Sequence, residues 1–149
     1  MAITVGNLLT DPSAQSFISV ADADEYLGLE QNEAWNLAPN ATLEAALVLA
    51  SRWLVDTYRS RLYPLDADGL LRIGRVAARL ASESLRGKLH LYEGVQAEKL
   101  VKSLKAGSVE VTYQDAMSAD AAGRAWPWLE GMLAGLVRGR GLGIGAMVV

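Results

Sequence analysis

The sequence predicts a mainly α-helical protein: a small helical bundle around one central helix, with a minor β strand or hairpin and extended N- and C-terminal arms. The first observation is the stretch TLEAALVLASRWLVDTYRSRL at residues 42–62, whose apolar side chains cover most of a helix circumference. A helix of this kind needs neighbours on several sides. The second observation is an apolar stripe of helical period within residues 73–84, which predicts a second long helix packed against the first.

The composition indicates one folded domain. The chain has 149 residues, of which 51% are hydrophobic and 21% are charged, so it can bury a substantial core. We expect residues 1–16 to form an N-terminal arm, residues 17–138 the helical domain and residues 139–149 a glycine-rich docking tail. The first residues lack a basic region and a long apolar run. We therefore expect no signal peptide, no membrane-spanning segment and a soluble protein.

The N-terminal half contains signals for three helices. Ser19, with Asp22 three residues later, predicts the cap of a short helix over residues 21–27, which Gly28 ends. Residues 32–40 predict a short helical turn and a loop. Thr42 is the predicted cap of the central helix, and Glu44 is expected to support the helix dipole from the first turn. The central helix should stop before Pro64.

The C-terminal half is harder to interpret. Residues 97–105 fit either a helix or a strand, whereas Val109, Val111 and Tyr113 alternate with polar residues and predict a strand. We expect a small-residue loop over residues 115–123. A last helix is predicted to begin at Pro127 and to run to about Arg138. The tail GRGLGIGAMVV is too rich in glycine for a helix and too apolar for an idle linker, so we expect it to dock against another surface.

The chain has few residues of the types that catalyse reactions or bind transition metals, such as cysteine and histidine. The chain has no cysteine, and His90 is its single histidine. No carboxylate spacing supplies partners for a catalytic dyad or a metal site. We therefore expect no catalytic residue, no cofactor site and no metal site, and we expect that the protein is not an enzyme.

Charge is distributed unevenly along the chain. Residues 1–68 carry ten acidic and three basic side chains, whereas the rest carries a net positive charge, and the total is −3. Such asymmetry suits an acidic face that meets the basic face of a neighbouring copy. Within the second long helix, four arginines fall in one arc and form a basic stripe: Arg72, Arg75, Arg79 and Arg86. The stripe is open to three interpretations: contact with nucleic-acid phosphates, contact with a neighbouring subunit, or a solvated face.

The order of several motifs resembles that of one protein family. SFISVADADEYL at residues 16–27 and EAALVLASRWLVDTY at residues 44–58 are similar to its opening segments. VAARLASESL, KAGSVEVTYQDA and WPWLEGMLAGLV follow in the same order and end at residue 137. The family is that of the head–tail adaptor (connector, or head-completion) proteins of long-tailed phages. The sequence departs from the family over residues 59–69, where many relatives have a longer segment.

The resemblance implies a structural protein of the virion, at the head–tail junction, made in the cytoplasm of a bacterial host. It implies a ring of about twelve copies beneath the portal protein, with a stopper or tail-terminator protein as the other partner. DNA would meet this ring only as the passing genome. Some relatives are labelled automatically as primosomal-protein-like, which gives the alternative of a single-stranded-DNA-binding replication accessory protein.

Docking to the portal or to a neighbouring subunit would use exposed apolar groups. Trp126 flanks the last helix and is either a core anchor or an interface anchor. The strand at residues 109–113 and the tail are the other predicted contact elements, because a strand edge pairs with another backbone and glycine lets two backbones approach closely. The candidate contact residues are Val109, Val111, Tyr113, Trp126, Leu142, Ile144, Met147, Val148 and Val149.

Overall fold

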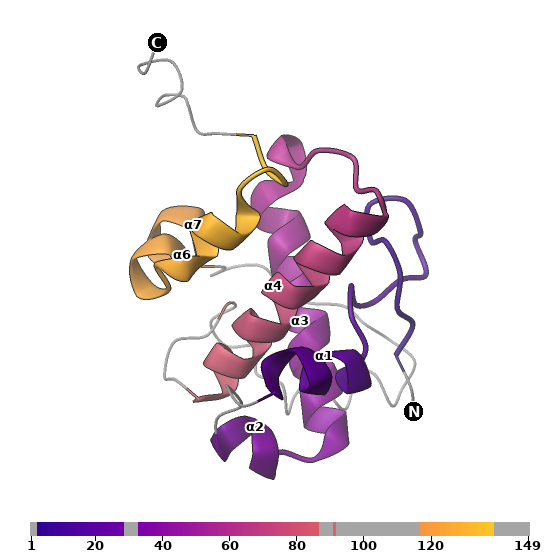
Figure 1. Ribbon diagram of the computed structural model, residues 1–149, viewed down its shortest axis with the longest axis vertical. Coiled ribbons are helices and arrows are strands. Elements are labelled where there is room, and N and C mark those ends of the chain that lie inside the picture. Colours follow the sequence, from indigo (N-terminus) through magenta and orange to yellow (C-terminus); the bar gives the residue numbers. More distant parts are fainter. Residues whose placement is uncertain (1–2, 29–32, 87–90, 92–116, 139–149) are drawn as a thin grey trace.

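A computed structural model describes residues 3–28, 33–86, 91 and 117–138 of the chain (Figure 1). The described part is mainly helical, and one long helix runs through its centre, as the sequence predicts. The predicted strand at residues 109–113, the ambiguous residues 97–105 and the tail at residues 139–149 lie outside the described residues. The helices are α1 Val20–Leu27, α2 Glu33–Leu37, α3 Asn40–Tyr58, the 3-10 helix η2 Arg59–Arg61, α4 Ala67–Arg86, α6 Ala119–Ala125 and α7 Trp128–Leu133.

Helix α3 is the predicted central helix. Its side chains are buried on several sides, and Leu47, Trp53 and Leu54 have no solvent exposure. Helix α4 packs along it, while α1, α2 and α7 in turn pack against α4. The inner face of α4 includes the predicted Ile73 and Leu80, which are fully buried. The two long helices therefore form the core onto which the short helices dock.

The start of α3 differs from the prediction. The helix begins at Asn40 after Pro39, so Thr42 lies inside the helix and is not its cap. Pro39 sets this boundary because a proline cannot supply an N–H to a preceding turn, whereas its fixed φ suits the residue that leads into a helix. Glu44 lies beyond the first turn. Its carboxylate, which is largely buried, accepts a hydrogen bond at 3.3 Å from the backbone N–H of Ile3 in the arm.

The prediction for α1 is confirmed. The Ser19 hydroxyl accepts a hydrogen bond at 3.1 Å from the backbone N–H of Asp22, and Gly28 ends the helix with a φ of +46°. The short predicted turn that follows is α2. The Trp35 indole N–H donates to the Asp24 carboxylate over 2.7 Å and thereby joins α2 to α1.

The N-terminal arm folds back on itself instead of staying extended throughout. A turn over residues 7–11 brings the backbone of Thr4 beside that of Gln15, whose N–H donates to the Thr4 carbonyl over 2.8 Å. Just after this turn, the hydroxyl and the backbone N–H of Ser13 donate hydrogen bonds to the Asp11 carboxylate, and both bonds lower the pKa of Asp11. Ile3 and Leu8 of the arm pack against the core.

Residues 16–18, which we call the strap, pass between the two long helices. On the α3 side, the backbone N–H of Phe17 donates to the buried Ser51 hydroxyl over 3.1 Å. On the α4 side, a Cβ placed on Gly74 would lie 3.1 Å from the Phe17 carbonyl oxygen and 3.3 Å from the Ile18 Cβ. Glycine in the middle of a helix is unfavourable by about 1 kcal/mol relative to alanine, and the close approach of the strap explains its presence here.

The C-terminal helices differ from the prediction. The expected loop at residues 115–123 is wrong, because Ser118 caps a helix, α6, by accepting a hydrogen bond from the Ala121 N–H. The last helix, α7, ends at Leu133 and does not reach Arg138, since the chain turns at Gly135, where φ is +85°. Leu136 nevertheless stays buried, as expected for the inner face.

The last described residues pair with the connection between α3 and α4. The Tyr63 N–H donates to the Leu136 carbonyl over 3.0 Å, and the Arg138 N–H donates to the Arg61 carbonyl over 2.7 Å. This pairing fixes the position from which residues 139–149 leave the described part.

Two glycine substitutions test the packing of the strap. Gly74→Ala should lower the free energy of unfolding by about 1 kcal/mol, because the added methyl group meets the backbone of residues 17–18 and this cost exceeds the gain in helix propensity. Gly131→Ala is the matched control. No atom lies within 4 Å of a Cβ there, so this change should raise stability by up to about 1 kcal/mol. Urea denaturation measures both, and a stabilising Gly74→Ala would contradict the packing described.

Candidate functional site

The described residues contain little that supports chemistry. Within residues 3–28, 33–86, 91 and 117–138, no group of three or more histidine, cysteine, aspartate or glutamate side chains is placed to hold a metal ion. His90 lies outside these residues. Among the helices described, none is both long enough and apolar enough to cross a membrane.

The arginines of the basic stripe contact their own chain. Arg72 donates a hydrogen bond over 2.6 Å to the carbonyl of Ala134, the C-cap residue that follows α7. The last carbonyls of a helix lack partners inside the helix, and a cation at this end also complements the helix dipole. Arg79 lies over the Trp128 ring, with 4.6 Å between the guanidinium carbon and the ring centroid. These two arginines hold α7 against α4.

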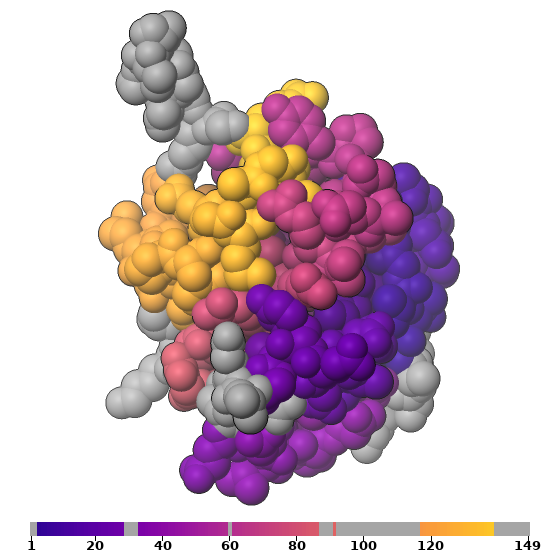
Figure 2. Space-filling model, in the orientation of Figure 1, coloured from indigo at the N-terminus to yellow at the C-terminus, as the bar shows by residue number. Residues whose placement is uncertain are grey.

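The other two members of the stripe are exposed. Arg75 lies over the Tyr26 ring of α1 at 5.2 Å, and Arg86 forms an ion pair with Glu83 one turn earlier on α4. All four arginines therefore have a role inside the chain, and the stripe docks α1 and α7 onto α4. On the face shown in Figure 2, α7 and α1 both lie against α4.

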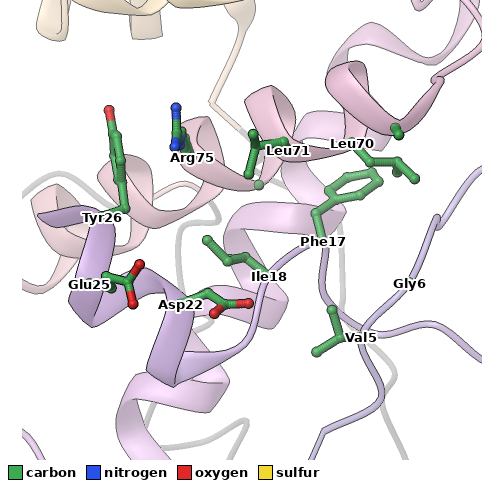
Figure 3. Close-up of a pocket in the computed structure, with 12 residues that line it drawn as sticks. Val5, Gly6, Phe17, Ile18, Asp22, Glu25, Tyr26, Leu70, Leu71 and Arg75 are labelled. Atoms are coloured by element: carbon green, nitrogen blue, oxygen red, sulfur yellow. The ribbon is translucent and has the colours of Figure 1, made fainter.

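The described surface contains an open groove of about 730 Å³ between the arm, α1 and the first half of α4 (Figure 3). We call it the α1–α4 groove. The strap contributes Phe17 and Ile18 to its apolar lining, and α4 contributes Leu70 and Leu71. At Gly74 the α4 backbone comes close to the strap because no side chain intervenes.

Two features of the groove are suited to binding. First, large apolar side chains are left open to solvent: Val5 of the arm is 45% exposed and Leu71 is 52% exposed. Second, the exposed carboxylates of Asp22 and Glu25 lie along the α1 side, and Arg75 is the basic residue of the lining. The groove therefore combines an apolar floor with a mainly acidic edge.

The predicted contact residues are distributed differently. Trp126, the C-cap residue of α6, is only 7% exposed, so it is a core anchor and not an exposed interface anchor. The remaining predicted contact residues lie outside the described residues: Val109, Val111, Tyr113, Leu142, Ile144, Met147, Val148 and Val149.

Of the residues that line the α1–α4 groove, Arg75 belongs to the predicted basic stripe, whereas the apolar lining was not predicted. Leu71 gave one usable signal, since it lies off the stripe that contains Ile73 and Leu80 and is therefore an apolar residue on the outer side of a long helix. Val5 and Phe17 gave none, because irregular backbone has no period from which burial or exposure can be predicted.

Comparison of the chain with protein-family models, with curated proteins and with solved structures finds no match. The resemblance to head–tail adaptor proteins therefore stays a prediction from the motifs.

Arginine substitutions test whether Arg72 stabilises the packing of α7 against α4. Arg72→Ala should lower the free energy of unfolding by about 1–2 kcal/mol, because it removes a charged donor from the α7 carbonyl. Arg86→Ala is the control on the same stripe and should cost at most about 0.5 kcal/mol, since an exposed ion pair contributes little. Urea denaturation gives both values. Equal losses of unfolding free energy in the two variants would contradict a role of Arg72 in holding α7.

Proposed function

We propose that this chain is a non-enzymatic structural protein of a tailed-phage virion, a head–tail adaptor subunit that joins the portal to the stopper or tail-terminator protein. The observation that carries the proposal is the order of its motifs, which runs from residue 16 to residue 137 in the sequence expected of that family. Fold alone does not identify function, so the proposal rests on this order and on the kind of surface the chain presents.

The resembling motifs include the segments that form the core. The first of them contains the strap and α1, the second lies in α3 and the third lies in α4. The last contains α7, which Arg72 and Arg79 hold against α4. A resemblance confined to solvated helix faces would carry less weight than one that includes the buried contacts between α3, the strap and α4.

The described surface supports a binding role over a catalytic one. The α1–α4 groove is open, and the apolar side chains of Val5 and Leu71 are exposed along it, as is typical of surfaces that bind other polypeptides. Its charged side chains, Asp22, Glu25 and Arg75, lie on the edge and are exposed. Catalytic acids and bases are usually found in enclosed sites beside specific partners, whereas these side chains are open to solvent.

The alternative of single-stranded-DNA binding receives little support. Arg72 and Arg79 hold α7, and their guanidinium groups are occupied by a carbonyl and an indole ring. Phosphate contact along one face needs several cations directed toward solvent. Of the stripe, Arg75 and Arg86 are the exposed members.

The decisive experiment is to analyse tailed particles of the virus that encodes the chain. Mass spectrometry of purified particles should find the chain in about the same copy number as the portal protein, and heads that lack it should fail to join tails. Absence of the chain from particles that carry complete tails would overturn the proposal.

A salt series with a single-stranded oligonucleotide tests the alternative. Tight binding that weakens steeply with salt, and that is lost on combined Arg75→Ala and Arg86→Ala substitution, would favour the replication role over the structural one. The adaptor proposal expects weak binding that these substitutions barely change.

A further inference from the structure

The surface of the α1–α4 groove is suited to binding a polypeptide. Val5 and Leu71 expose apolar area on opposite elements of the groove, the arm and α4 (Figure 3). Exposed apolar side chains that converge in a hollow mark binding sites more often than isolated ones do.

The chain contains one segment of matching chemistry. Residues 139–149 carry five large apolar side chains and four glycines, and Arg140 is their only charged side chain. An apolar, basic segment complements a groove with an apolar floor and the exposed carboxylates of Asp22 and Glu25. The glycines let its backbone pass close to the groove wall.

We propose that the α1–α4 groove of each copy binds residues 139–149 of a neighbouring copy. This inference rests on the proposed function, because it supplies the link between subunits of a ring. In the bound state the apolar side chains of the tail lie on Phe17 and Leu71, and Arg140 faces Glu25 or Asp22.

The position of the last described residues allows such an exchange. Arg138 is held on the connection between α3 and α4, with its N–H on the Arg61 carbonyl and its guanidinium group 5.4 Å from the centre of the Tyr63 ring. From this anchor, eleven residues in extended form reach roughly 36 Å, enough to cross to an adjacent subunit. A tail on one surface and a groove on another form a head-to-tail contact, which generates a ring when the rotation between copies closes.

A binding measurement tests the groove directly. A fluorescent peptide of residues 139–149 is titrated against the chain truncated after Arg138, which removes the competing tail. We expect saturable binding that Leu71→Asp weakens by at least about tenfold, because the substitution places a charge on the apolar floor. Leu37→Asp is the matched control: Leu37 is 76% exposed on α2, outside the groove, and its substitution should leave the affinity within about twofold.

The acidic edge gives a second arm of the experiment. Glu25→Lys should lower the affinity of the peptide for the groove and should reduce the salt dependence of binding, since it replaces attraction to Arg140 with repulsion. Glu33→Lys, an exposed charge reversal on α2, is the control and should have little effect. No saturable binding to the truncated chain, or equal effects of Leu71→Asp and Leu37→Asp, would overturn the inference.

A complementation experiment decides between a neighbour's groove and the chain's own groove. Full-length Leu71→Asp retains a tail without an intact groove, and the truncated chain retains a groove without a tail. Sedimentation of the mixture should show a complex that neither variant forms alone, and the unmodified full-length chain should self-associate over the same concentrations. If the mixture forms a complex while the unmodified chain stays monomeric, the tail occupies its own groove and the inference fails.

These outcomes are separate from those that test the proposed function. A peptide that does not bind would remove the link between subunits but would leave the presence of the chain in tailed particles untouched. If the peptide binds but the chain is absent from purified particles, the groove is still the binding site of the tail, and the adaptor role is wrong.

Discussion

The strap at residues 16–18 is the constraint on which the rest of the structure depends. Its backbone is held by the Ser51 hydroxyl of α3 on one side and lies against Gly74 of α4 on the other. Buried polar groups need partners, and the Ser16 hydroxyl supplies one by donating to the Ile18 carbonyl over 2.7 Å. The strap leads directly into α1 and forms part of the groove floor. The spacing of the two long helices and the shape of the groove therefore have the same origin.

The two sides of α4 make different kinds of contact. One side packs against α3 through apolar residues, and the other carries the arginines that hold α1 and α7. Arg72 donates to a carbonyl, and Arg75 and Arg79 lie over aromatic rings. The carboxylates of Asp22 and Glu25 are exposed at the groove. The uneven charge of the chain is thus only partly used within one subunit, which supports a basic partner for the acidic edge.

The elements with a strong local signal could be predicted from the sequence. The apolar period identified both long helices, and the Ser19 cap and Gly28 marked the limits of α1. The secondary-structure prediction was wrong in the segment made mostly of small residues. The loop predicted over residues 115–123 overlaps helix α6, because alanine is a strong helix former and Ser118 supplies the cap. The groove could not be predicted, because it depends on contacts between the arm, the strap and α4, which are far apart in the sequence or irregular in backbone.

The central claim is that this chain joins other proteins and that its contacts are made through the surface beside the strap. Electron cryomicroscopy of the head–tail junction in assembled particles tests the claim most directly. The account predicts a ring of this chain on the portal, with extended density from one copy lying between α1 and α4 of the next. A junction of complete particles built without this chain would contradict it.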